Sequence, residues 1–174
     1  INVTMSYTTF GTYKDFQKHG AIGDLYESYV NSCPQCHYSG YQKDIDTTFS
    51  EATKQDILKI LEPYKNVKMN DVIENEIAIQ IHHYFKRGND DIAWLYLVAS
   101  YFLRNDTSMV EKRKELQRNS AEYLIKAIDN KEYKDKSTYA SMQYLVGELY
   151  RRTGDFTLAV KYYDLALADK HQKD

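Results

Sequence analysis

The stretch YLVGELYRRTGDFTLAVKYYDLALA, residues 144–168, constrains the fold more than any other part of this chain. Its first half has apolar residues at helical spacing, a Gly-Asp break follows, and its second half resumes the same spacing. Gly147 and Ala159 are small residues, one in each half, that allow two antiparallel helices to approach closely. Tyr163 supplies an aromatic ring that fills the space above them. The pattern predicts a closely packed helical hairpin.

This arrangement follows the tetratricopeptide pattern, in which Gly-x-x-Tyr on one helix precedes Ala-x-x-x-aromatic on the next, about 34 residues per unit. Tyr150 completes the first half of that pattern. A weaker copy lies upstream, where Trp94, Leu97 and Tyr101 have the matching spacing. We therefore predict a mainly α-helical chain in which residues 48–174 form a short tetratricopeptide-like solenoid or bundle.

Capping residues and apolar periodicity locate the other helices. The predicted starts are Thr48, Asp71, Ser108 and Ser137. The side chains predicted to face the core of these helices are Ile57, Leu58, Leu61, Ile73, Ile77, Ile81, Tyr84, Leu116, Tyr123, Leu124 and Ala127. Short turns between the helices indicate that successive helices run antiparallel.

Residues 1–47 have a different texture, rich in Thr, Tyr, Gly, Ser and Asp. Weak alternation with β-branched and aromatic residues predicts strands near residues 3–11, 25–32 and 38–46. The last two flank the turn CPQC, which contains both cysteines of the chain. We predict a small β-ribbon, zinc-ribbon-like in outline, placed before the helical domain.

The cysteine pair permits three interpretations. A structural zinc site needs four ligands, and the candidates are Cys33, Cys36, His19 and His37, with Asp15 or Asp24 as further options. A disulfide between Cys33 and Cys36, or a redox-active dithiol, is the second interpretation. The third is covalent haem, because Cys-x-x-Cys-His matches the attachment signature with His37 as axial ligand.

Three motifs in this order, CPQCHYSGY, IAWLYLVASYFLR and YLVGELYRRTGDFTLAVKYY, resemble the bacterial family called domain of unknown function 2225. The resemblance implies a CPxCG-type ribbon followed by tetratricopeptide-like helices and no known enzymatic activity. Two positions depart from the family pattern. Gln17 stands where relatives carry a further cysteine, and His37 replaces the glycine that follows the second cysteine.

Function is constrained mainly by exclusion. The formal charge is -2, with basic and acidic residues dispersed, so nothing favours nucleic-acid binding. No apolar run reaches the ~18 residues of a membrane span, and no phosphate-binding or hydrolase motif is present. We expect a non-catalytic interaction or scaffold module that binds a protein or peptide, with a redox or electron-transfer protein as the alternative. The expected partner-binding residues are Tyr144, Tyr150, Arg151 and Arg152.

The cellular compartment stays open. The sequence begins with Ile1 and shows no signal-peptide pattern. We therefore expect a bacterial protein that is either cytoplasmic or exported to the periplasm or the medium. That choice matters for the cysteines, because exported proteins favour disulfides.

Overall fold

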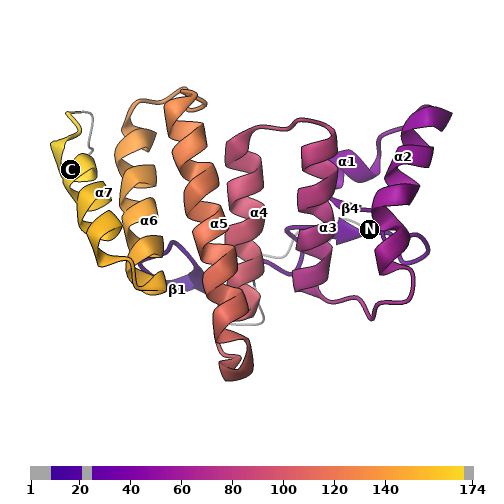
Figure 1. The fold of residues 1–174 in the computed structure, drawn as a ribbon, viewed down its shortest axis with the longest axis horizontal. Coiled ribbons are helices and arrows are strands. Elements are labelled where there is room, and N and C mark those ends of the chain that lie inside the picture. The colour runs from indigo at the N-terminus through magenta and orange to yellow at the C-terminus, as the bar shows by residue number, and fades with distance from the viewer. Residues whose placement is uncertain (1–8, 21–24, 171–174) are drawn as a thin grey trace.

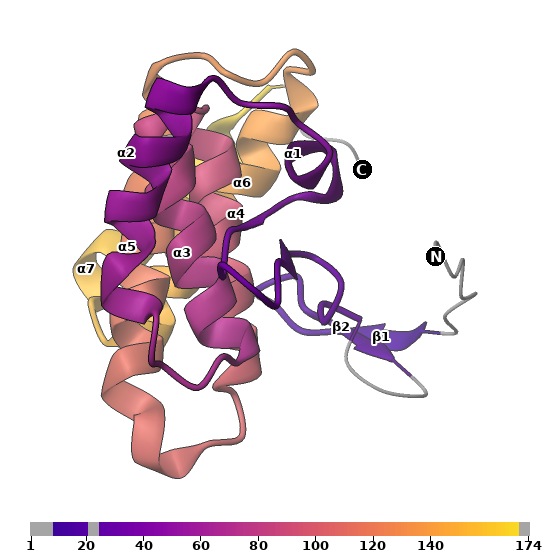
Figure 2. The same ribbon diagram turned by 90° about the vertical axis from the view of Figure 1, so that its right-hand side faces the viewer.

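The computed structural model describes residues 9–20 and 25–170, and this part of the chain is mainly helical. Figure 1 shows α3 to α7 standing side by side in chain order, with α2 at one end of the row and α7 at the other. Figure 2 shows that the N-terminal strands lie on one side of this helical layer. The predicted mainly α-helical class is confirmed.

The elements follow a simple order along the chain. The strands are β1 (Thr9–Thr12), β2 (Lys18–Gly20), β3 (Asn31–Ser32) and β4 (Ser39–Gly40). The helices are α1 (Gln42–Ile45), α2 (Glu51–Leu61), α3 (Asp71–Tyr84), α4 (Asn89–Phe102), α5 (Val110–Asp129), α6 (Ser137–Thr153) and α7 (Phe156–Ala168). Short 3-10 helices, Glu62–Tyr64 and Thr107–Met109, follow α2 and precede α5.

The observed helix starts lie at or within three residues of the predicted ones, but the residue that caps each helix often differs from the prediction. α6 begins at Ser137, as predicted, and α3 begins at Asp71, although the side chain of Asn70 caps it by accepting from the N–H of Ile73. The predicted cap at Thr48 is wrong, because Ser50 caps α2 instead. Several polar residues that favour N-caps stand in a row there, so the sequence alone does not choose among them.

The predicted cap at Ser108 is also displaced. Asp106 accepts hydrogen bonds from the backbone N–H and the hydroxyl of Ser108, and the 3-10 turn that starts there leads into α5 at Val110. An aspartate two residues upstream therefore takes the capping role, because its carboxylate reaches the same unpaired N–H groups.

The largest core cluster joins α4, α5 and α6. Leu97 of α4 and Leu145 of α6 are fully buried, as are Ala93, Val98, Ala121, Val146 and Leu149 around them. A second cluster joins α2 and α3 through Ile57, Leu61, Ile77 and Ile81. The second cluster confirms the predicted faces of α2 and α3, and the buried Leu116, Leu124 and Ala127 confirm the predicted face of α5.

Two predicted core residues face solvent instead. Leu58 is 45% exposed and Tyr84 is 38% exposed. Leu58 follows the buried Ile57 by one residue, which turns its side chain about 100° away from the core. Tyr84 donates its hydroxyl to Asp56 at 3.2 Å, so its polar end lies at the surface while its ring packs on Phe85.

Residues 9–20 and 25–47 contain two short antiparallel hairpins, β1 with β2 and β3 with β4. The predicted strand over residues 25–32 is wrong for most of its length, because only Asn31–Ser32 pair and the preceding residues form turns. The predicted strand over residues 38–46 is likewise reduced to Ser39–Gly40. Tyr41 then caps the short helix α1, where the Asp44 carboxylate accepts from its backbone N–H. Residues 3–8 of the first predicted strand lie outside the described residues.

Candidate functional site

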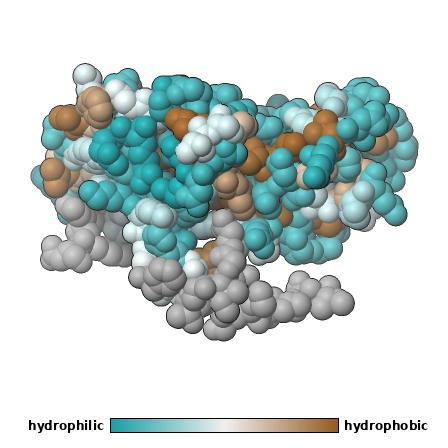
Figure 3. All heavy atoms as spheres, turned by 90° about the horizontal axis from the view of Figure 1, so that it is seen from below, coloured by the Kyte–Doolittle hydropathy of each residue, from teal (hydrophilic) through white to brown (hydrophobic). Residues whose placement is uncertain are grey.

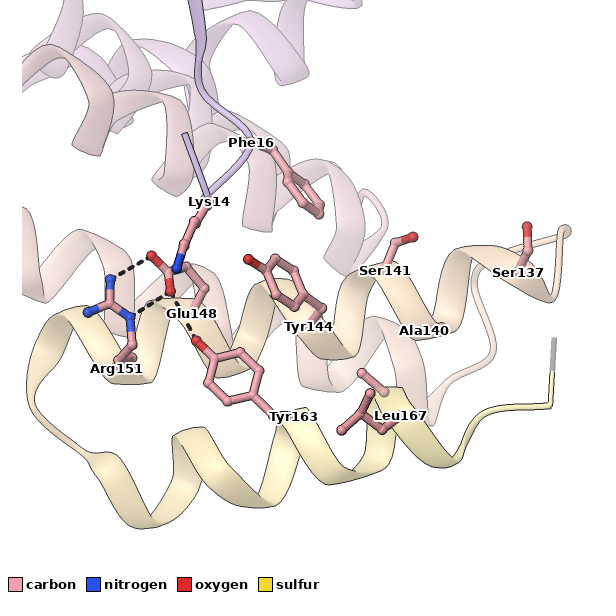
Figure 4. Close-up of a pocket in the computed structure, with 11 residues that line it drawn as sticks. Lys14, Phe16, Ser137, Ala140, Ser141, Tyr144, Glu148, Arg151, Tyr163 and Leu167 are labelled. Atoms are coloured by element: carbon pink, nitrogen blue, oxygen red, sulfur yellow. Dashed lines mark hydrogen bonds and ion pairs between the residues drawn. The ribbon is translucent and has the colours of Figure 1, made fainter. Parts of the chain in front are cut away.

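A groove of about 640 Å³ lies between the N-terminal segment and the hairpin formed by α6 and α7 (Figure 4). Its lining includes Lys14 and Phe16 from the loop between β1 and β2, Tyr144 and Arg151 from α6, and Leu167 from α7. Figure 4 shows the side chains of both helices and of the loop converging on one space. Elements that are more than 120 residues apart in sequence numbering therefore build one concavity.

The floor of the groove depends on the close approach of α6 and α7. A Cβ atom placed on Gly147 would lie 2.7 Å and 2.8 Å from two ring carbons of Tyr163, and 3.1 Å from the carbonyl oxygen of Ala159. Only glycine fits such a contact without movement of its neighbours. Gly147, Ala159 and Tyr163 lie at this crossing, as the sequence pattern predicts.

Glu148 is a fully buried acid at the base of the groove. Its carboxylate accepts hydrogen bonds from Arg151 Nε at 2.7 Å, from Arg152 Nε at 2.8 Å and from the hydroxyl of Tyr163 at 3.0 Å. Burial by itself raises the pKa of this carboxyl. The hydrogen bonds from the two arginines and the tyrosine outweigh burial and lower the pKa to about 2. The acid is therefore ionised, and it fixes the positions of the three side chains around it.

Asp15 is a second fully buried acid, and it attaches the N-terminal segment to two separate helices. Its Oδ2 atom lies 2.5 Å from Arg104, just after α4, and 3.4 Å from Arg152 of α6. The hydroxyl of Tyr101 in α4 also donates to the carbonyl oxygen of Asp15 at 2.5 Å. The segment therefore crosses the helical layer from α4 to α6.

Phe16 follows in the left-handed region, with φ of 67°, and its ring stacks on Tyr144 with centroids 6.0 Å apart. That backbone conformation is unfavourable for a phenylalanine and persists only where surrounding contacts hold it. Here the anchored Asp15 on one side and the stacked ring on the other supply those contacts.

The groove has a polar end and an apolar end. Ala140, Ala166 and Leu167 make the apolar end. At the polar end the lining carries Lys14, Arg151 and the buried Glu148, which leaves an excess of one positive charge. Arg104 and Arg152 lie outside the lining and pair with the buried acids.

The structure brings together only part of the predicted partner-binding set. Tyr144 and Arg151 line the groove. Arg152 lies behind it, paired with both buried acids. Tyr150 stacks on Tyr162 with ring centroids 6.0 Å apart and does not line the groove. Sequence reasoning missed Lys14, Phe16 and Glu148, and no local signal identified the first two, because their partners are remote in sequence.

The CPQC turn forms the tip of the β3–β4 hairpin. The N–H of His37 donates to the carbonyl oxygen of Cys33 at 2.9 Å, and the N–H of Cys33 donates to Tyr38 at 2.9 Å. His37 takes the left-handed conformation, φ 63°, that glycine ordinarily supplies there. Both thiols are free, and Cys36 is exposed.

The two thiols differ in acidity. Hydrogen bonds from the backbone N–H groups of Cys36 and Gln35 lower the pKa of Cys33. Desolvation, together with the neighbouring Cys33, raises the pKa of Cys36. A turn that directs N–H groups at one sulfur stabilises its thiolate, which is the form that binds metals and attacks disulfides.

The side chains of the other predicted zinc ligands that the structure describes contact groups outside this turn. His19 belongs to the β1–β2 hairpin, with its ring 3.9 Å from that of Tyr13, and Nδ1 of His37 lies 3.0 Å from the carbonyl oxygen of Tyr64. Asp15 is held by the arginines, and Asp24 lies outside the described residues. Over residues 9–20 and 25–170, no three His, Cys, Asp or Glu side chains gather as a metal site would require. The described turn supplies two of the four ligands that structural zinc needs, and the zinc site stays a prediction.

Comparisons with known proteins place the chain in a family. None of the helices over residues 9–20 and 25–170 combines the length with the apolar content that a membrane span requires. Neither the curated proteins nor the solved structures yielded a match. Residues 11–174 match a family described as an uncharacterized protein conserved in bacteria, DUF2225. Because that match covers nearly the whole chain, the protein belongs to the DUF2225 family.

Proposed function

We propose that this chain is a non-catalytic protein-interaction module that binds a peptide segment of a partner protein in the groove beside α6 and α7. In this proposal α4 with α5 and α6 with α7 act as two tetratricopeptide-like units. Arrays of such units commonly bind partners on their concave surfaces. The observation that carries the proposal is the groove itself, which combines an apolar end with a cationic end.

The chain's own N-terminal segment supports this interpretation. Asp15 and Phe16 lie across α4 and α6, with the acid paired to arginines and the ring stacked on Tyr144. The helical layer thus already holds an acidic residue next to an aromatic one. The groove continues from this segment toward Leu167.

The chemistry of the lining defines the ligand. An acidic side chain or a chain-terminal carboxylate would neutralise part of the positive excess near Lys14 and Arg151. An aromatic or aliphatic side chain a few residues away would fill the space beside Ala140 and Leu167. We therefore infer a short peptide that carries an acidic group next to an apolar residue.

The test is selection from a library of short peptides against the purified chain, followed by calorimetric titration of the selected peptides. We expect peptides with adjacent acidic and apolar residues and micromolar affinity. Lys14→Glu should weaken binding, and Ser141→Trp, which fills the groove, should abolish it. Lys134→Glu, the same charge change at an exposed position outside the groove, is the matched control. Binding that is indifferent to both groove variants, or the absence of any binder, would refute the proposal.

We further propose that the Cys33–Cys36 turn has a structural role, either as two ligands of a zinc ion or as a disulfide that closes the hairpin. A segment this small and polar buries little apolar surface by itself, so a covalent or metal link would stabilise it. Metal analysis with a thiol count after denaturation distinguishes the two forms. Bound zinc with two reactive thiols indicates the metal, and no metal with no free thiol indicates the bridge.

A redox role is the second candidate, and the unequal acidity of the two thiols favours it. It predicts a dithiol that titrates at a potential within the range of known oxidoreductases. The covalent-haem version predicts a visible absorption band. A colourless protein whose thiols stay inert toward disulfide reagents would eliminate both versions.

A further inference from the structure

Most of the charged side chains lie at or near the surface, and the face shown in Figure 3 is mainly hydrophilic. His82 is an exception. It belongs to the last turn of α3 and is only 2% exposed. Within residues 9–20 and 25–170, neither nitrogen of its ring has a hydrogen-bond partner. Buried polar groups without partners are rare in folded proteins because each one destabilises the fold. His82 therefore adds no stability through hydrogen bonds of its ring.

His82 is covered by residues 39–45, which contain β4 and α1 and are called the β4–α1 segment below. β4 packs against α3, and Figure 1 shows α1 beside the same helix. The ring of Tyr41 meets the ring of His82 edge to face, with centroids 4.9 Å apart. Asp44, itself 4% exposed, places its Oδ2 atom 3.6 Å from Nε2 of His82. This distance is longer than a hydrogen bond, so the imidazole and the carboxylate touch without being bonded.

The charges that face His82 come from α1, from the turn after α3 and from α4. Asp44 of α1 lies nearest, and its Oδ1 atom accepts from Arg87 Nη2 at 2.6 Å. Asp91 lies in the first turn of α4. Tyr41 stays neutral, because burial raises its pKa. Burial is the largest influence on the pKa of His82 and outweighs the two acids, so this pKa lies below its ordinary 6.5.

We propose that His82 is an acid-sensitive contact, which keeps the β4–α1 segment packed on α3 while it is neutral and releases the segment when it is protonated. Protonation places a further charge in an enclosed space where the Asp44 carboxylate is already paired with Arg87. Release exposes the ring to water, which solvates the imidazolium. β4 is also the second strand of the hairpin that carries Cys33, and Cys33 packs against the core cluster of α2 and α3. Acidification therefore exposes this thiol as well.

The direction of the pH dependence follows from the two states of the segment. While the segment is packed, the pKa of His82 is below 6.5, and after release it returns to about 6.5. Packing of the segment is therefore at full strength above pH 6.5. Below that pH the packing equilibrium should weaken by at most about tenfold for each pH unit, and it should level off below the pKa of the packed state.

Hydrogen exchange of backbone amides, followed by mass spectrometry and corrected for the intrinsic effect of pH on exchange, tests the release. Between about pH 7.5 and about pH 5 the amides of residues 39–45 should lose protection while those of α6 keep theirs. The reason is that a one-turn helix and a two-residue strand pair do not persist without support. His82→Phe and His82→Gln do not take up the proton, so both should remove the pH dependence. His83→Gln, at the exposed neighbouring position, is the matched control and should behave as the wild type.

The ring of His82 supplies a measurement that needs no variant. An NMR titration of its Cε1 proton in the wild-type chain should give a pKa below 6.5. A pKa at or above 6.5 would overturn the proposal. Protection of residues 39–45 that does not change with pH, or that falls equally in the two His82 variants, would do the same. Loss of protection from α6 together with the segment would indicate global unfolding and would also contradict a local release.

Discussion

Replacing Gly147 with alanine tests the contact on which the α6–α7 hairpin depends. In an ordinary helix interior this change stabilises the helix by about 1 kcal/mol, because alanine restricts the unfolded chain. At this position the added methyl group would lie 2.7 Å from Tyr163 Cδ1 and 3.1 Å from the backbone oxygen of Ala159. The helix preference therefore predicts that Gly147→Ala stabilises the protein, whereas the tertiary contact predicts that it destabilises it.

The magnitude follows from what must move. Carbon atoms in contact prefer a separation of about 3.5–4.0 Å, so the ring of Tyr163 would have to retreat by roughly 1 Å. Overpacking of this kind costs about 1–3 kcal/mol. The displacement also strains the hydrogen bond from the tyrosine hydroxyl to the Glu148 carboxylate, and bonds to charged groups contribute about 1.5–3 kcal/mol. After the helix preference is deducted, we expect a net loss of about 2 kcal/mol.

Thermal and urea unfolding measure this loss. For a chain of this length we expect the melting temperature to fall by about 4–8 °C. Glu122→Ala, at an exposed position on α5, is the control and should change stability by less than about 0.5 kcal/mol. When Tyr163→Leu has removed the ring, the same alanine should become neutral or stabilising. A Gly147→Ala variant that melts above the wild type would refute the close contact between the helices.

Four further outcomes can be measured. Because the folded-state pKa of Glu148 is about 2, below its ordinary 4.5, its contribution to stability should be present above pH 4.5 and disappear as the pH falls toward 2; Glu148→Gln should flatten that part of the stability curve. Asp15→Asn should cost about 3–5 kcal/mol, because it leaves the partly buried Arg104 without its acid and removes one of the two acids paired with Arg152, and should speed amide exchange in the N-terminal segment. Lys131, with φ of 56° at the end of α5, should tolerate glycine with a gain of about 0.5–1 kcal/mol in urea unfolding. Iodoacetamide near neutral pH should alkylate Cys33 before Cys36, as peptide mass spectrometry can show; the reverse order would contradict the assigned acidities.

The sequence by itself determined the helices and the crossing of the last two. α6 begins at the predicted residue, α7 follows the predicted Gly-Asp break, and Gly147 lies at the predicted close contact. These features depend on caps, turns and apolar spacing, all of which act between residues a few positions apart. The family resemblance was readable for the same reason, because its motifs are local.

The tertiary structure alone decided where the groove lies. Tyr101 donates to the backbone of Asp15 across 86 positions, and Arg104 pairs with its carboxylate across 89. No periodicity relates residues so far apart, since their meeting depends on how the N-terminal segment crosses the finished helical layer. Tertiary packing also decides that Arg152 pairs with the two buried acids and that Tyr150 stacks on Tyr162 outside the groove. Local spacing shows which residues share a helix face, but only the packed helices show which of those faces meets a distant segment.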